Sequence, residues 1–156
     1  MQIHFIVVGQ KMPKWVQEGY SEYAKRLPKT CALNLIELPM SQRGKTSSVD
    51  QNKQEEAKRI LAAIPKGARL VVLDEHGQQP TTLQLSSKLE DWLSGGQDVA
   101  LVVGGPDGLE ASLIQQADWT WSLSKLTLPH PLVRVLIAEQ IYRAWSVIQN
   151  HPYHRE

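Results

Sequence analysis

The chain has 156 residues, of which 42% are hydrophobic and 21% are charged, a balance typical of one folded domain and not of a disordered chain. Its net charge of +1 excludes the strongly basic profile of many RNA-binding domains, and its single cysteine, Cys31, excludes an intramolecular disulfide and a cysteine-based zinc site. No apolar run is long enough to span a membrane, and the sequence opens without a signal-peptide profile. We therefore expect one cytoplasmic domain over residues 1–156.

The charge is unevenly distributed along the chain. Residues 1–60 carry a net charge of +4, residues 61–120 a net charge of −5, and residues 121–156 a net charge of +2. If the two ends meet in the fold, they form a modest basic surface, although ordinary solvated charge explains the same distribution. An RNA-binding protein of this composition would need more basic surface, for example from a second copy of itself.

The first half of the chain contains two predicted strands and two predicted helices. The β-branched, apolar run Gln2–Val8 indicates a strand. Pro13 favours the first turn of a helix, which we expect over Pro13–Arg26. Ala32–Leu38 alternates between polar and apolar residues and predicts a second strand. The polar stretch Ser41–Asp50 predicts an exposed loop, and its Asp50 is expected to cap a helix that ends near Ile64.

The second half continues the alternation of strands and helices. The short apolar runs Arg69–Leu73 and Val99–Val103 predict buried strands, and a turn is predicted directly after the first run. The predicted strands are Arg69–Leu73, Val99–Val103 and Thr120–Leu123, and the turn is Asp74–Gly77. The predicted helices run from Thr81 or Thr82 to Leu93, from Leu109 to Ala117 and from Leu132 to Ile148. This order predicts an α/β fold with a mainly parallel sheet and helices on both faces.

Ligands of open α/β sheets bind beside the carboxyl ends of the strands, and three predicted loops leave such ends. They follow Leu73, Val103 and Leu123. The second loop contains Gly104, Gly105 and Gly108, which allow a ligand to approach the backbone closely. Its spacing matches neither the dinucleotide-binding pattern nor the P-loop pattern. The glycines therefore indicate either a ligand site or a tight strand-to-helix turn.

The segment from Ser124 to Pro131 combines polar residues with Leu126 and Leu128, and we expect it to be buried. Its backbone N–H and C=O groups then need partners, which either a neighbouring backbone or a ligand with hydrogen-bonding edges, such as a purine, would supply. His130 stands between two prolines at the end of this segment. From the residues alone, it is equally well explained as a structural histidine and as a functional one.

The C-terminal tail, Gln149–Glu156, is dense in groups that exchange protons or stack on bases. The two explanations are a frayed terminus and a part of an active site. The histidines His130, His151 and His154 lack the usual spacing of zinc ligands, so we predict no metal site.

Several long motifs carry a resemblance that runs almost from end to end. They are VVGQKMPKWVQEGYSEYAKRLP, VVLDEHG, LVVGGPDGL, SLSKLTLPHPLVRVLIAEQIYRAW and the terminal NHPYHRE. With these motifs the chain resembles the ribosomal large-subunit methyltransferase H family, in the SPOUT class of RNA methyltransferases. The resemblance implies a C-terminal trefoil knot (the α/β knot), with the last helix threaded through a loop.

The resemblance also implies a reaction, a cofactor and partners. The implied reaction is methylation at N3 of a pseudouridine in large-subunit (23S) ribosomal RNA, with S-adenosylmethionine as cofactor. The family acts as a homodimer on the assembled 70S ribosome. The implied cofactor residues are Leu73, Gly104, Leu123, Ser124, Lys125, Leu126, Thr127 and Leu128. The alternatives are a SPOUT methyltransferase for another RNA, such as a transfer RNA, and a ribosome-binding factor without catalytic activity.

Within that reaction, the residues of the tail and of the last helix are candidates for catalysis. Methylation of an imide nitrogen requires loss of its proton, for which His154 is the first candidate base and His130 the second. Arg143 or Arg155 would stabilise the negative charge that develops on the imide oxygens. Tyr153 would stack on the target base or orient it.

Overall fold

The computed structural model describes residues 1–41 and 48–155, and in that part of the chain five parallel strands form one sheet. The strand order is β2-β1-β4-β3-β5. The strands are β1 (Gln2–Val8), β2 (Ala32–Leu38), β3 (Arg69–Gln78), β4 (Val99–Val103) and β5 (Trp119–Trp121). The α-helices are α1 (Lys14–Ala24), α2 (Val49–Ala63), α3 (Thr82–Gly95), α4 (Ala111–Gln116) and α5 (His130–Ile148), with a short 3-10 helix at Lys29–Cys31. Most of the expected loop Ser41–Asp50 lies outside the described residues.

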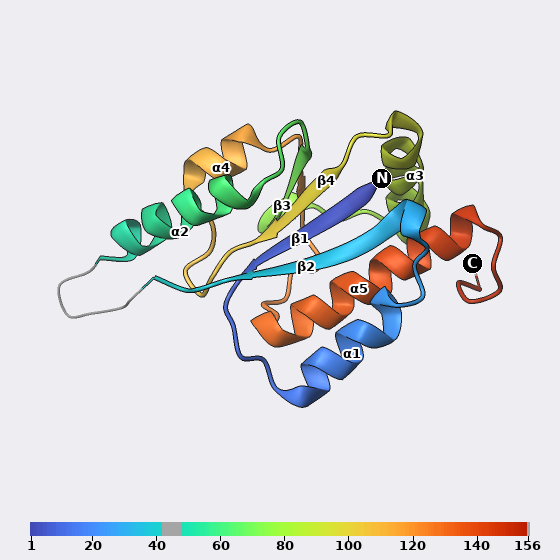
Figure 1. Ribbon diagram of the computed structural model, residues 1–156, viewed down its shortest axis with the longest axis horizontal. Helices are drawn as coiled ribbons and strands as arrows, with labels where there is room; N and C mark the ends of the chain where they lie inside the picture. Colours follow the sequence, from blue (N-terminus) through green and yellow to red (C-terminus); the bar gives the residue numbers. More distant parts are fainter. Residues whose placement is uncertain (42–47, 156) are drawn as a thin grey trace.

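Helices cover both faces of the sheet, as the sequence predicts (Figure 1). One face packs against α1, α3 and α5, with Tyr20, Leu89 and Ile137 in its core. The opposite face packs against α2 and α4, with Ile60 and Leu113 in its core. Every residue of β4 is buried, which fits its central position in a parallel sheet covered on both faces. The predicted α/β class and the parallel sheet are therefore confirmed.

The structure corrects several predictions. Helix α5 begins two residues before the expected Leu132, at His130, and α4 and α1 are shorter than expected. The segment Asp74–Gly77 is not a turn, because β3 continues to Gln78 through an irregularity and pairs there with Trp121. The cap of α2 is not Asp50 but Ser48, whose side chain accepts a hydrogen bond from the Gln51 N–H in a capping box. The last strand, β5, begins one residue earlier than expected and ends two residues earlier.

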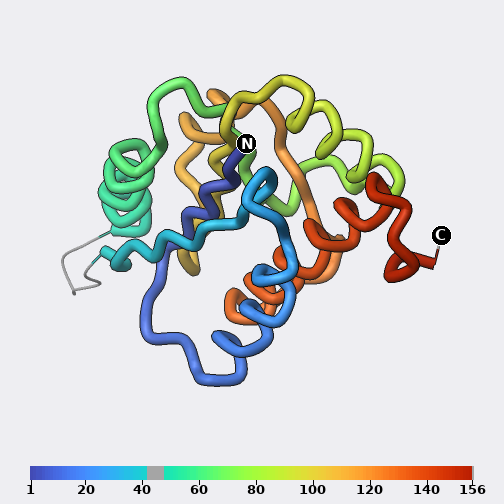
Figure 2. The backbone as a smooth tube through the Cα atoms, turned by 45° about the vertical axis from the view of Figure 1, so that its right-hand side comes forward, coloured from blue at the N-terminus to red at the C-terminus, as the bar shows by residue number. Residues whose placement is uncertain are grey.

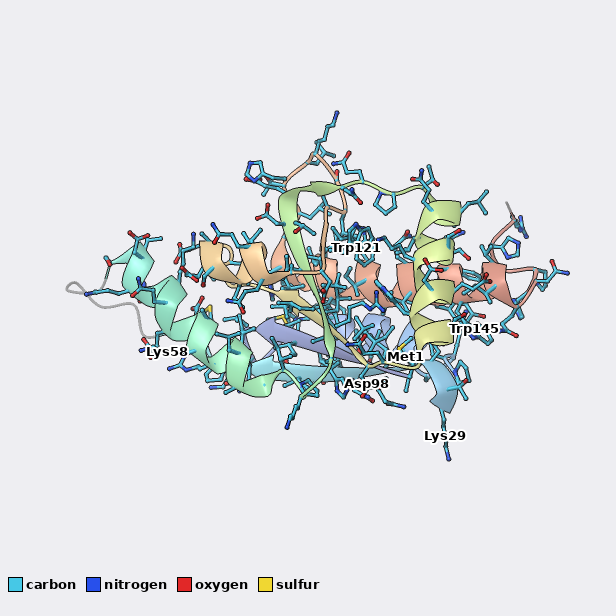
Figure 3. The ribbon with its side chains drawn as sticks, turned by 90° about the horizontal axis from the view of Figure 1, so that it is seen from above. Met1, Lys29, Lys58, Asp98, Trp121 and Trp145 are labelled. Carbon is cyan, nitrogen blue, oxygen red and sulfur yellow. The ribbon has the colours of Figure 1, made fainter. Side chains whose placement is uncertain are left out.

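Helix α5 is the element that positions the site, and it runs between α1 and α3 (Figure 1). Its first residues lie beside the carboxyl ends of the central strands, where Arg134 bonds to the Gly9 carbonyl that follows β1. Its last turns lie at the opposite end of the molecule. Figure 3 shows Trp145 of these turns at the same end as Lys29, which precedes β2. Residues 149–155 extend from this far end of the helix (Figure 2).

Candidate functional site

A cavity of about 330 Å³ opens where the chain leaves β5 and runs toward α5. Its wall combines the segment after β5, the first turn of α3 and the middle of α5. The lining residues are Pro80, Leu85, Trp121, Ser122, Leu123, Ser124, Leu128, Leu136 and Gln140. Cavities of this size, with an apolar lining and a few polar groups, are typical of small-molecule sites.

The segment that borders this cavity is tied to the sheet at one end and is exposed at its apex. The Ser122 N–H donates to the Gln78 carbonyl at 2.8 Å, and the Ser122 hydroxyl donates to the Ser124 carbonyl at 3.1 Å. Further along, Leu126 is 76% exposed. The expectation that this segment is buried is therefore wrong for the single chain, because no other element of its described part covers the apex.

Two backbone groups of the segment fit a ligand with hydrogen-bonding edges. The N–H groups of Leu123 and Leu128 have no hydrogen-bond partner within the described residues, and both residues line the cavity. Unpaired backbone donors beside apolar walls suit a purine ring, which offers acceptor nitrogens on its edge and apolar faces. The residues present therefore fit the adenosine part of S-adenosylmethionine.

The implied cofactor residues do not all reach this cavity. Leu123, Ser124 and Leu128 line it, whereas Lys125, Leu126 and Thr127 form the exposed apex of the segment. Leu73 lies in β3, where it pairs with Trp121, and it does not line the cavity. Gly104, at the end of β4, is also absent from the lining.

Gly104 is required by a tight turn. A Cβ atom at Gly104 would lie 2.9 Å from the backbone of Gly108, so any side chain there would clash. Gly108 has a φ of 82°, a left-handed conformation that favours glycine, and its N–H donates to the Gly105 carbonyl. The interpretation of this loop as a tight strand-to-helix turn is thus confirmed, and a contact between Gly104 and a cofactor stays a prediction.

The tail folds back onto the far end of α5 and joins a cluster of polar side chains. The Tyr153 hydroxyl donates to Glu139 Oε1 at 2.9 Å, and Arg143 donates to the same oxygen through Nε at 2.9 Å. The Arg143 guanidinium also lies 5.0 Å from the centre of the Tyr153 ring. His154 is half-buried, with its Nδ1 3.5 Å from the Ser146 hydroxyl oxygen. The structure therefore brings together three of the predicted catalytic residues: Arg143, Tyr153 and His154.

Tyr153 is held in its protonated form. Burial, together with the hydrogen bond to Glu139, raises the pKa of Tyr153 to about 12. At neutral pH its hydroxyl is therefore a donor and not a base, which agrees with a stacking or orienting role. Arg155, the neighbour of this cluster, is exposed and adopts a left-handed φ of 52°.

His130 lies apart from the tail. It occupies the first turn of α5, 13 residues before Arg143, which places the two about 20 Å apart along the helix. Burial, with a smaller effect of the Arg134 charge, lowers the pKa of His130, so its imidazole is neutral at neutral pH. Its Nε2 is buried and has no partner within the described residues. One chain thus does not bring the two candidate bases to one place.

Sequence reasoning missed two residues that connect the tail with the cavity. Glu139 accepts hydrogen bonds from Tyr153, Arg143 and Gln140, and Gln140 also lines the cavity. Only the i,i+4 spacing of Glu139 and Arg143 signals part of this network in the sequence. The remaining contacts depend on where the tail folds.

Two general findings concern the described part of the chain. No helix there combines the length and the apolar content that crossing a bilayer requires. No three side chains of His, Cys, Asp or Glu converge there in a way that would hold a metal ion. The absence of a metal from the reaction stays a prediction.

Comparisons with known proteins give the class of this protein. A family model described as a predicted SPOUT methyltransferase matches residues 1–154, so the parallel α/β sheet is that of a SPOUT methyltransferase. Two relatives are both named ribosomal RNA large subunit methyltransferase H. The relative from Hydrogenovibrio crunogenus is 76% identical over 156 residues, which is 100% of each chain. The relative from Marinomonas sp. is 54% identical over 155 residues, covering 99% of this chain and 100% of the relative.

The chain belongs to the ribosomal RNA large subunit methyltransferase H family. The predicted trefoil knot is confirmed, because SPOUT methyltransferases are α/β folds of the knot type. S-adenosylmethionine is the cofactor of this class of enzyme.

Solved structures agree with the fold and show no more than the fold. A putative methylase family protein from Neisseria gonorrhoeae superposes with a TM-score of 0.50 at 15% identity, over 90% of this chain and 81% of the other. A structure described as giving insights into the 2-OH methylation of C/U34 on tRNA superposes with a TM-score of 0.52 at 14% identity, over 94% of this chain and 97% of the other.

Proposed function

We propose that this protein methylates N3 of a pseudouridine in 23S ribosomal RNA, with S-adenosylmethionine as methyl donor. It acts in the cytoplasm, as a homodimer, on the assembled 70S ribosome. The observation that carries the proposal is the direct connection of the tail cluster with the cofactor cavity through Gln140 and Glu139. The names of relatives that are 76% and 54% identical over essentially the whole chain support the choice of ribosomal RNA.

The cofactor cavity would be used through its apolar wall and its free backbone donors. S-adenosylmethionine supplies an electrophilic methyl group when it is bound. Leu123, Ser124 and Leu128 would hold it, since they line the cavity and two of them present unpaired N–H groups within the described chain. Gly104 and the residues of the exposed apex stay candidates for a contact that one unliganded chain does not make.

In this proposal, a histidine acts as the general base that removes the proton from the target nitrogen. His154 is the first candidate, because it lies in the tail cluster beside Ser146. His130 is the second, because its buried Nε2 has no partner in the described chain and its lowered pKa keeps it neutral. In single-turnover methylation, His154→Ala should lower the rate about 10²- to 10⁴-fold, the usual contribution of a general base. An unchanged rate across the pH range would remove His154 as the base.

The negative charge that develops on the imide oxygens would be stabilised by a cation in the tail. Arg143 is the better placed candidate, since Glu139 and the Tyr153 ring fix its guanidinium. Arg155 is exposed beside the cluster and is the alternative. Fixed donors of this kind act without reorganising during the reaction, which is why they lower a barrier effectively.

A second copy and the ribosome complete the site in this proposal. A net charge of +1 leaves one chain with little attraction for RNA, and a dimer doubles the basic surface. Lys11, Lys14, Lys25 and Arg26 are exposed candidates for phosphate contacts, and the further candidates Arg43 and Lys45 lie outside the described residues. The separation of His130 from the tail within one chain supports a site to which two chains contribute.

The test is methyl transfer from labelled S-adenosylmethionine to intact 70S ribosomes, free large subunits and bulk transfer RNA, each offered separately. The proposal predicts label on a large-subunit pseudouridine, with intact ribosomes as the substrate. Label on transfer RNA would replace the substrate and keep the enzyme class. Bound cofactor without label on any RNA would favour a ribosome-binding factor.

A further inference from the structure

A second and larger cavity lies on the other side of α5, between α1 and the end of β2. Its volume is about 460 Å³, within the range of small-molecule sites. Arg134 lines this cavity, whereas Leu136, two residues further along α5, lines the cofactor cavity. Residues two apart on a helix point in nearly opposite directions, so α5 separates two distinct cavities. The proposed reaction uses only one of them.

Arg134 is buried in the wall of this second cavity with its Nε–H unpaired among the described residues. The residue is 1% exposed, its Nη1 donates to Glu37 Oε2 at 2.6 Å, and its Nη2 donates to the Gly9 carbonyl at 2.8 Å. These two bonds fix the guanidinium. Its Nε–H has no hydrogen-bond partner within the described residues. A buried donor that stays unpaired is costly, and a ligand acceptor would remove that cost.

Tyr20 lines the same cavity and carries a second unpaired polar group. It is 8% exposed, its ring stacks on Phe5 at 6.2 Å, and its hydroxyl has no partner in the described part of the chain. Burial raises the pKa of Tyr20 far above its ordinary value, so the hydroxyl keeps its proton. Two residues with an unpaired donor, one from α1 and one from α5, thus line one cavity.

The remaining lining selects the kind of ligand. Met12, Val16 and Leu35 give the cavity apolar walls that suit the faces of a flat ring. Glu37 lies in the same wall and balances the Arg134 charge, which opposes the entry of a free phosphate. A nucleobase has apolar faces and a polar edge with carbonyl oxygens, and it matches this combination. Lys11, exposed in the lining, is suited to the phosphate of the same nucleotide.

We propose that this cavity binds a second nucleoside of the RNA substrate, whose base carbonyl oxygen accepts hydrogen bonds from Arg134 Nε–H and the Tyr20 hydroxyl. The ligand is a carbonyl-bearing base such as uracil, because one carbonyl oxygen has two lone pairs for the two donors, whereas each ring nitrogen of adenine has only one. This inference rests on the proposed function only in taking RNA as the source of the base. The cavity lies across α5 from the cofactor cavity, so the base that it binds is not the methylated one.

The direct test observes the Arg134 Nε–H resonance of the full-length protein by NMR, assigned by its loss in Arg134→Lys. Uridine 5′-monophosphate and a five-nucleotide oligouridine should both shift this signal, and the oligomer should act at lower concentration. Adenosine 5′-monophosphate and inorganic phosphate should leave it in place. A shift with the free nucleotide but not with the oligomer would overturn RNA as the source. An equal shift with the adenine nucleotide, or no shift with any uridine ligand, would overturn the site.

A conservative variant keeps the test independent of folding. Tyr20→Phe removes only a hydroxyl that has no partner in the described chain, so the protein should fold, and uridine 5′-monophosphate should bind about three- to tenfold more weakly. The matched control is Tyr23→Phe, on the same helix but outside the cavity lining, which should bind as the wild type does. Equal binding by both variants would contradict the role of Tyr20.

These readouts need neither cofactor nor methyl transfer. Uridine binding by a protein that methylates no RNA would overturn the proposed reaction and keep the cavity. Methylation without any shift of the Arg134 signal would keep the reaction and overturn the cavity.

Discussion

The arginines at the two ends of α5 differ in their burial and in their bonding partners. At the start of the helix, Arg134 is 1% exposed and bonds to Glu37 and the Gly9 carbonyl, yet its Nε–H stays unpaired within the described chain. Near the end of the helix, Arg143 is half-buried and lies in a network with Glu139 and Tyr153. The first arginine ties α5 to the strand ends, and the second ties the tail to α5.

This difference indicates a division of roles along one helix. A buried, fixed cation with an unpaired donor lowers the stability of the fold unless a ligand pairs with that donor. Arg134 is therefore suited to a position that both holds the fold and binds a ligand. A partly exposed arginine adds little to stability, because solvent screens its charge. It is therefore suited to a position where the substrate approaches. The two arginines allow this division to be tested with identical substitutions.

The largest effect is expected on the rate of methyl transfer, from a substitution near the C-terminal end of α5. Arg143→Met should lower the rate of methyl transfer about 10²- to 10³-fold, as does the loss of a fixed donor to a developing anion. Its free energy of unfolding should stay within about 1 kcal/mol of the wild type, because the ion pair with Glu139 is partly exposed. Single-turnover kinetics and chemical denaturation measure the two quantities. A loss of activity matched by a loss of folding would contradict a role in the reaction.

The next effect is expected at the start of the helix, on stability. Arg134→Met should lower the free energy of unfolding by about 2–3 kcal/mol, since it leaves the Gly9 carbonyl without its bond from the guanidinium. The loss stays below that of a fully buried pair because the Glu37 side chain is 38% exposed and can be hydrated. Urea denaturation of this variant beside Arg143→Met gives the comparison. Equal stability of the two variants would contradict the division of roles.

The smallest effect is a pH dependence at His130. Its pKa is lowered in the folded protein, first by burial and then by the Arg134 charge. The unfolded chain takes up this proton near the ordinary value of 6.5, before the folded chain does. The stabilising contribution is therefore complete above that pH and is lost as the pH falls through the folded pKa. His130→Gln should show a shallower loss of stability on acidification. An NMR titration with a midpoint at or above 6.5 for His130 would contradict the account.

Much of the fold is readable from local patterns in the sequence. Three strands have the predicted ends, because apolar and β-branched runs between turn residues define buried parallel strands well. They are Gln2–Val8, Ala32–Leu38 and Val99–Val103. The extension of β3 over Asp74–Gly77 was not predictable, since these residues favour a turn and only pairing with β5 makes them a strand. The prediction of the knot rests on the family resemblance, because the periodicity of a sequence carries no information on threading.

The site was predictable as a set of residue types and not as an arrangement. The sequence identifies Tyr153, His154 and Arg143 as chemically suited groups. It does not show that Glu139 joins them, because that depends on where the tail folds. The apolar side chain of Leu126 predicts burial, yet Leu126 is exposed, since burial depends on what covers a segment.

The most direct test of the account compares the full chain with a chain that ends after Asn150. The shortened chain lacks Tyr153 and His154 but keeps the cavity formed by α3, α5 and the segment after β5. The measurement is cofactor affinity by calorimetry beside methyl transfer to 70S ribosomes. The shortened chain should bind S-adenosylmethionine within about threefold of the full chain and transfer methyl groups at least about 10²-fold more slowly. Methyl transfer at the rate of the full chain would contradict the assignment of the chemistry to the tail.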